Sequence, residues 1–330
     1  MAVSLFLAAC AAEPEKTGSP AVVEITEVFY GTNRDRIEQK GAAPRYGQDR
    51  GYYQLGVASV HGMPAEDKTR VDSVAPLPPG EFNSRLRAAV AAAPEPVVFV
   101  FVHGFLRSFG RVARSVAEFS ANTRFVGVPV MWSWPSTSNP ARYTVDETNM
   151  DWAMPDFARF LQNIFAESGA RKIHLVGHSL GGRALSKVVI YELLPANLDV
   201  SRVGQFVLLA PDIDQEIFRR QYAPALLAAD LNLSLYTSAN DKAMASARAV
   251  HGYPRAGDSA GGPLLVPGIE TIDVTPANRS FLGHSYFGES DAVASDLGLL
   301  LNRGLPAAER PGMQFVETKS GEFWRLTPPE

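Results

Sequence analysis

Cysteine is almost absent from this sequence, since Cys10 is the only one among 330 residues. An intrachain disulfide needs two cysteines, so a disulfide framework is excluded. No cluster of cysteine and histidine shows the spacing of zinc ligands along the chain. We therefore expect no metal site, and a fold that is stabilised by packing.

An excess of one charge is also missing. The chain has 31 basic and 35 acidic residues, which gives a formal net charge of -4. No overall positive field is available to attract nucleic acid, so we expect a small molecule as the partner and no nucleic acid. With 46% hydrophobic and 20% charged residues, the chain can bury a large core.

Long hydrophobic runs are lacking too. The apolar run at residues 3–9 is too short to span a bilayer, and it ends in Leu7-Ala8-Ala9-Cys10. This string resembles the lipobox of bacterial lipoproteins, which implies cleavage before Cys10, a lipid anchor on its thiol and a periplasmic location at the cell envelope. Lys and Arg are absent near Met1, unlike in a full signal peptide, and the alternative is a frayed apolar N-terminus on a cytoplasmic protein.

Short blocks of β-forming residues alternate with helical stretches through most of the chain. This pattern is typical of a mostly parallel sheet with helices on both faces, here of about eight strands. With no internal repeat and no break in composition, we expect a signal segment and tether at 1–20, one α/β domain at 21–304 and a C-terminal tail at 305–330 that could form a hairpin.

Individual elements follow from the same pattern. Val97 to Val102 (VVFVFV) predicts a buried central strand, and 109–122 predicts a helix with apolar residues at helical spacing. The polar, glycine-containing stretch 31–50 is expected to be a loop. Further strands are expected at 24–30, 52–60, 126–132, 172–176, 205–210, 232–237 and 269–274, and further helices at 86–93, 152–165, 180–194 and 291–301.

A nucleophile motif lies between a predicted strand and a predicted helix. Lys172 to Val176 runs into Gly177-His178-Ser179-Leu180-Gly181. In a nucleophile elbow the serine has strained backbone angles, and flanking glycines avoid collisions with the neighbouring strand and helix. Ser179 is therefore the candidate nucleophile.

A second motif, Phe101-Val102-His103-Gly104-Phe105, ends the predicted central strand. Acyl transfer passes through a tetrahedral intermediate whose negative oxygen needs two backbone N–H donors. The candidates for this oxyanion hole are the amides of Leu180 and Phe105. The alternative is an ordinary turn in which His103 is structural.

The serine also needs a histidine base and a carboxylate that orients it. His284 follows the last predicted strand of the domain and precedes the final helix, so we prefer it to His251. For the acid we prefer Asp241, which follows the strand at 232–237 and could alternatively cap a helix. Asp212 and Asp214, after the preceding strand, are the alternative acids.

The order Ser179, Asp241, His284 resembles the α/β-hydrolase superfamily. Four strings are similar to a bacterial family of uncharacterised, esterase-like hydrolases, often lipoproteins: Val28-Phe29-Tyr30-Gly31-Thr32-Asn33-Arg34, Trp132-Ser133-Trp134-Pro135-Ser136, Ala210-Pro211-Asp212-Ile213-Asp214 and Gly283-His284-Ser285-Tyr286. The similarity covers residues 23–301. It implies that Asn33, Arg34 and the Trp-Ser-Trp-Pro segment shape or brace the site, although each could be structural.

The sequence therefore predicts a serine hydrolase that cleaves carboxylic esters of small or medium size through an acyl-enzyme, without a cofactor. Two alternatives remain at this stage. One is an amidase or peptidase with the same triad, and the other is a non-catalytic binding module of the cell envelope.

Overall fold

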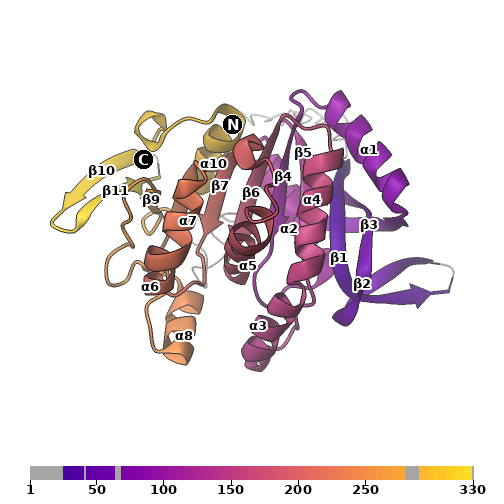
Figure 1. Cartoon of the computed structure of the whole chain (residues 1–330), viewed down its shortest axis with the longest axis horizontal. Coiled ribbons are helices and arrows are strands. Elements are labelled where there is room, and N and C mark those ends of the chain that lie inside the picture. Colours follow the sequence, from indigo (N-terminus) through magenta and orange to yellow (C-terminus); the bar gives the residue numbers. More distant parts are fainter. Residues whose placement is uncertain (1–24, 41, 64–67, 279–289, 329–330) are drawn as a thin grey trace, which may run out of the picture.

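The computed structural model describes residues 25–40, 42–63, 68–278 and 290–328. Over these residues, eleven strands form one sheet in the order β10-β11-β9-β8-β7-β6-β4-β5-β1-β2-β3 (Figure 1). The strands are β1 (Ile25–Gln39), β2 (Ala42–Met63), β3 (Lys68–Leu77), β4 (Val97–Val102), β5 (Val128–Ser133), β6 (Lys172–His178), β7 (Val203–Leu209), β8 (Leu233–Thr237), β9 (Glu270–Asp273), β10 (Met313–Thr318) and β11 (Gly321–Leu326).

The sheet is mostly parallel, as expected, but it is wider than the expected eight strands. Every neighbouring pair from β11 across to β1 is parallel, whereas β1–β2, β2–β3 and β10–β11 are antiparallel. The additional width comes from the two ends of the chain. The indigo strands form one edge of the sheet and the yellow C-terminal hairpin forms the other (Figure 1).

The expected loop at 31–50 is wrong, because these residues continue β1 and β2 as a paired hairpin. The register runs from Thr32 opposite Gln54 to Gln39 opposite Ala42, with several bulges. Polar residues can alternate along such a ladder because an antiparallel strand tolerates one solvated face. The strand β3 was also missed, since its sequence is mixed in polarity.

Helices cover both faces of the sheet. The face toward the viewer in Figure 1 carries α4, α5 and α7, while α2 and α10 lie behind. The helices are α1 (Pro79–Ala92), α2 (Phe109–Asn122), α3 (Tyr143–Trp152), α4 (Met154–Glu167), α5 (Leu180–Val188), α6 (Gln215–Ile217), α7 (Ala223–Ala228), α8 (Lys242–His251) and α10 (Asp291–Arg303), with π-helical turns η2 (Val189–Leu193) and η4 (Phe218–Tyr222) and 3-10 turns η1 (Pro140–Arg142), η3 (Val200–Arg202) and η5 (Ala307–Glu309).

The strand β4 shows why its sequence is a continuous apolar run. Its valines Val98, Val100 and Val102 pack into the core under α4 and α5, while Phe99 and Phe101 pack into the core under α2 and α10. All five side chains are at most 2% exposed. A parallel strand that is buried on both faces has no polar side, so the expectation for Val97–Val102 is confirmed.

The carboxyl ends of the parallel strands meet at one end of the sheet. There α3 follows β5 and α8 follows β8, and both lie at the lower end of the molecule in Figure 1. Polar loops from several strands can therefore converge at this edge, which is where ligands bind in open α/β sheets. None of the helices in the described ranges has the length and apolar character to cross a membrane.

Candidate active site

Ser179 occupies the turn between β6 and α5 in a strained conformation. Its backbone angles are φ 55° and ψ -124°, a region that residues with a side chain rarely adopt. Four backbone hydrogen bonds hold it there: its N–H donates to Leu209 O at 3.0 Å, and its carbonyl accepts from Gly182 N at 3.0 Å, Asp212 N at 3.2 Å and Arg183 N at 3.4 Å. The surrounding strands thus impose the strain, as in a nucleophile elbow.

The glycines beside Ser179 are required by close backbone approach. A Cβ atom on Gly181 would lie 2.2 Å from Val102 O, and one on Gly177 would lie 2.6 Å from Gly182 Cα. Gly104 faces Ser179 itself, because a Cβ there would lie 2.6 Å from Ser179 Cβ. The His-Gly turn after β4 therefore contacts the Ser179 turn after β6.

Three of the six non-glycine residues with positive φ in the described ranges follow strands at this edge of the sheet. Leu106 after β4, Ser179 after β6 and Ala210 after β7 are non-glycine residues with positive φ, at 64°, 55° and 42°. Each such residue costs on the order of 1 kcal/mol or more, and residues of this kind concentrate at functional sites. The edge formed by β4, β6 and β7 is therefore the candidate active site.

Both predicted oxyanion donors belong to this edge. Leu180 is the first residue of α5, so its amide lies among the N–H groups at a helix N-terminus, where negative charge is favoured. Phe105 follows Gly104 in the loop that contacts Ser179. The ring of Phe105 packs edge to face against Tyr143 at 5.2 Å between centroids.

Asp241 is 2% exposed and is the N-cap residue directly before α8. Its Oδ1 accepts hydrogen bonds from the amides of Ala243 and Met244, both at 2.9 Å. The carboxylate therefore caps the helix N-terminus, which was the alternative role, and a helix cap also holds a carboxylate in a defined orientation.

Asp212, an alternative acid, is enclosed by cations. Arg255 Nε donates to its Oδ1 at 2.6 Å, Arg183 Nη2 lies 3.4 Å from the same oxygen, and the Tyr143 hydroxyl donates to its Oδ2. Burial alone would raise the pKa of the Asp212 carboxyl, but the charges of Arg183 and Arg255 and these hydrogen bonds lower it below its usual value. Asp212 is thus an ionised carboxylate whose charge is already compensated.

Asp214, the other alternative acid, is only partly buried. Its Oδ1 accepts from the amides of Glu216 and Ile217 and so caps the short helix α6. No contact of Asp214 with the Ser179 turn is found among the described residues.

The structure describes His251 but not His284, which lies outside the described residues, as does Cys10. His251 ends α8, with Nε2 3.2 Å from Glu147 Oε1 and 3.3 Å from the Tyr143 hydroxyl. It thus joins α8 to α3. The link between Asp241 and His284 stays a prediction.

The residues that were expected either to brace the site or to be structural divide between these two roles. Asn33 donates to Asp156 at 3.0 Å, and Trp132 stacks on Phe157 within the core at 5.4 Å. Trp134 stacks on His103 at 4.9 Å, and its indole N–H donates to the His103 carbonyl at 2.9 Å. Trp132 is therefore a core residue, whereas Trp134 supports the loop beside Ser179.

Sequence reasoning missed Tyr143, Arg183 and Arg255. They come from α3, from α5 and from a loop, so no sequence spacing relates them. The one available signal was that Arg183 lies four residues after Ser179, one helical turn along α5.

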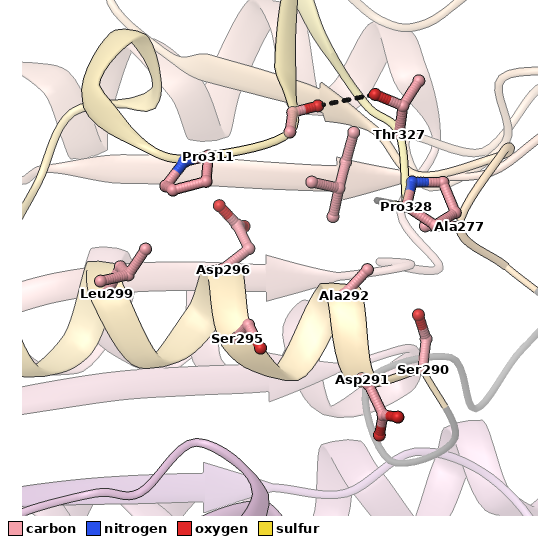
Figure 2. A pocket seen from close by; sticks show the side chains of 12 residues that line it. Ala277, Ser290, Asp291, Ala292, Ser295, Asp296, Leu299, Pro311, Thr327 and Pro328 are labelled. Atoms are coloured by element: carbon pink, nitrogen blue, oxygen red, sulfur yellow. Dashed lines mark hydrogen bonds between the residues drawn. The ribbon is translucent and has the colours of Figure 1, made fainter. Parts of the chain in front are cut away.

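A separate cavity of about 640 Å³ lies between α10 and the C-terminal hairpin. Figure 2 shows Ser295 and Asp296 of α10 on one side and Pro311 and Thr327 on the other. Between this hairpin and the Ser179 turn of β6 stand β9, β8 and β7 in the sheet order. The cavity is therefore not the space that a substrate of Ser179 would occupy. Among the described residues, no group of three or more His, Cys, Asp or Glu side chains could hold a metal ion.

A strand-turn-helix with a strained serine on a mostly parallel, helix-covered sheet defines the class of α/β hydrolases. The family model described as "Alpha/beta hydrolase of unknown function (DUF900)" matches residues 79–303. This range is more than half of the chain, so the chain belongs to that family and is a hydrolase of the α/β class. The match covers His103, Ser179 and Asp241.

Solved structures similar to the chain have low sequence identity to it. A predicted CIB-like hydrolase from Thermoplasma acidophilum is 9% identical, with a TM-score of 0.39 over 84% of this chain and 99% of that chain. An α/β serine hydrolase without a lid from Xanthomonas campestris is 13% identical, with a TM-score of 0.38 over 76% and 92%. An esterase of the fungus Rhizomucor miehei is 13% identical, with a TM-score of 0.36 over 87% and 84%. No curated protein matches the chain significantly.

Proposed function

We propose that the protein is a serine hydrolase that cleaves carboxylic esters of small or medium size through an acyl-enzyme on Ser179. The observation that carries this proposal is the strained backbone of Ser179 at the end of β6, held by four backbone hydrogen bonds and packed against Gly104. Strain of this kind costs stability, so its presence at a serine between a strand and a helix supports a catalytic role.

The reaction would proceed in two steps. His284 takes the proton of the Ser179 hydroxyl while its oxygen attacks the ester carbonyl, and the protonated imidazole then gives that proton to the leaving alcohol. Water hydrolyses the acyl-enzyme in the same manner. The amides of Leu180 and Phe105 stabilise the negative oxygen in both steps, and each is worth about 3 kcal/mol in the barrier.

Asp241 would orient His284 and stabilise its positive charge. The N-terminus of α8 holds the Asp241 carboxylate through Oδ1, which leaves the direction of the carboxylate defined. Asp212 is less suited because Arg183 and Arg255 already neutralise it. A carboxylate whose charge is compensated stabilises an imidazolium poorly.

The connection from β7 to β8 is consistent with an ester of modest size as the substrate. Its helix α7 packs Leu226 into the core beside the sheet, as a crossover helix does, so this short connection forms no large lid. Amides are the harder substrates for the same triad, and a panel of matched esters and amides separates the two activities.

The test compares Ser179→Ala with Ser186→Ala. Ser186 lies on α5, where its hydroxyl donates to Gly182 O at 2.9 Å, so the control removes a buried hydroxyl from the same helix. We expect p-nitrophenyl butyrate hydrolysis to fall at least about 1,000-fold in Ser179→Ala and little in Ser186→Ala. A fluorophosphonate should label wild-type Ser179, as mapped by mass spectrometry. Equal activity of Ser179→Ala and wild type would show that Ser179 is not the nucleophile, and absence of both labelling and hydrolysis would favour a binding module.

A further inference from the structure

Arg34 is a fully buried, charged arginine beside the loop after β4 that contains Gly104 and Phe105. It lies on β1, outside the segment that matches the family, and is 0% exposed. Burial lowers the pKa of Arg34 to about 9, so it stays charged at neutral pH. Among the described residues no carboxylate lies within ion-pair distance of its guanidinium.

The guanidinium joins three segments of the chain. Its Nε donates to Ser133 Oγ at 2.9 Å, and its Nη1 donates to the carbonyls of Gly47 at 3.0 Å and Ser136 at 3.4 Å. Its Nη2 donates to the carbonyl of Arg107 at 2.7 Å and contacts His103 Nε2 at 3.4 Å. The rigid planar fork of arginine can serve all of these acceptors at once, which a lysine ammonium cannot do.

The contact with Arg34 favours one tautomer of His103. Ser133 Oγ, 3.5 Å from Nε2, can donate or accept, but an arginine has donors and no acceptor, so Arg34 favours an Nε2 that accepts and carries no proton. Burial and the charge of Arg34 hold the pKa of His103 well below its usual value, so the ring is neutral. Its proton therefore resides on Nδ1, which donates to the carbonyl of Gly104 at 2.7 Å.

The Gly104 carbonyl and the Phe105 N–H belong to one peptide unit. In a trans peptide these two groups point in opposite directions. A hydrogen bond that holds the carbonyl toward the His103 ring therefore aims the Phe105 N–H away from that ring. Were Nδ1 to lose its proton, the carbonyl would face a lone pair, and the peptide would be free to rotate.

The next residues of the loop are held in the same way. Leu106 has φ 64°. Burial raises the pKa of the nearby Asp146 carboxyl, and hydrogen bonds from Ser136, Thr137 and the Leu106 backbone counter that rise. The Arg107 amide donates to Ser136 Oγ at 3.2 Å, and that hydroxyl donates to Asp146 at 2.6 Å. A strained residue that is bonded on both sides persists only because its surroundings determine it.

We propose that Arg34 is a positioning residue for the oxyanion hole, which acts by fixing the His103 tautomer and thereby the direction of the Gly104–Phe105 peptide. This proposal rests on the proposed function, because it assigns the Phe105 amide as a donor to the reacting oxygen. Arg34 itself does not touch the substrate.

The test uses two pairs of variants and p-nitrophenyl butyrate as the substrate. His103→Asn places its amide donor near the position of Nδ1, whereas His103→Gln places it near Nε2. Arg34→Met removes the guanidinium, and Arg310→Met is its control, because Arg310 is 3% exposed and pairs with Asp296 and Glu270 at the opposite edge of the sheet.

We expect kcat to fall about 100-fold in Arg34→Met and His103→Gln, as for loss of one oxyanion donor, while KM changes less than about threefold. Inhibition by a boronic acid, which forms a tetrahedral adduct, should weaken by a similar factor. His103→Asn should retain at least about tenfold more kcat than His103→Gln, and Arg310→Met should keep kcat within about twofold while losing stability.

Equal kcat in the two His103 variants, or a folded Arg34→Met with the kcat of Arg310→Met, would overturn the role of Arg34. If Arg34→Met does not fold, the comparison of kcat between His103→Asn and His103→Gln tests the proposal by itself. Failure of the proposed function has a different signature: the wild type would neither cleave the ester nor be labelled at Ser179.

Discussion

Two buried aspartates follow neighbouring strands at the same end of the sheet, and their surroundings differ in charge. Asp212, after β7, is bonded by two arginines and a tyrosine, whereas Asp241, after β8, is bonded by the amides at the start of α8. Both are at most 2% exposed, so burial does not distinguish them. The comparison teaches that the partners of a carboxylate, more than its depth, determine whether its charge is available to a histidine.

The largest expected effect is on catalysis in Asp241→Asn. Asparagine is as good a helix cap as aspartate, so stability should change by less than about 1 kcal/mol. Loss of the negative charge and of the correct histidine tautomer should lower kcat by about 10,000-fold. The measurements are kcat with p-nitrophenyl butyrate and urea unfolding of the same samples. If Asp241→Asn retained its kcat and Asp212→Asn lost it, Asp212 would be the acid that orients the histidine, and Asp241 would be a structural helix cap.

Asp212→Asn should instead affect stability. It leaves Arg255 buried without its counterion and removes one of the two counterions of Arg183, which still pairs with Glu147. The free energy of unfolding should therefore fall by about 3 kcal/mol at neutral pH. The lower pKa of the Asp212 carboxyl in the folded state stabilises the wild type above the ordinary value of 3.8, and this stabilisation is lost as the pH falls through the folded value.

The gap in stability between wild type and Asp212→Asn should therefore narrow when urea unfolding is repeated at about pH 3. A gap that is constant with pH would mean that packing, and not charge, accounts for the effect. The matched control is Asp241→Asn, which removes an equally buried carboxylate from the neighbouring loop.

The smallest effect is expected for Asp214→Ala. This residue caps α6 from a partly exposed position, so its loss should cost about 1 kcal/mol and leave kcat within about twofold. Thermal unfolding and the same ester assay measure both quantities. A large loss of kcat would make Asp214 a candidate for the catalytic acid again. The acid would then come from the loop after β7 and not from the loop after β8.

Local sequence was sufficient for several parts of the fold. The strand Val97–Val102 and the helix Phe109–Asn122 have the predicted bounds, because a run buried on both faces and a helical apolar stripe are both periodic signals. The edge strands were harder. The residues 31–50 pair through backbone groups, and beyond the buried Thr32, Asn33 and Arg34 most of their polar side chains are exposed. Their composition therefore resembles that of a loop.

The Ser179 turn could be located from five consecutive residues, since a strained serine needs small neighbours and those neighbours are adjacent in sequence. Arg34, Asp146 and Arg255 could not be placed by the same reasoning. Each of them acts on a residue more than 35 positions away, and a buried arginine has no local pattern that distinguishes it from an exposed one.

By itself, the sequence determined the parallel sheet and the glycine-flanked Ser179 turn, because these depend on contacts between near neighbours. The tertiary structure alone decided which aspartate is enclosed by two arginines and which groups face the ring of His103. Both depend on arginines brought from distant segments into a medium of low dielectric, where one cation beside an ionisable group shifts its pKa.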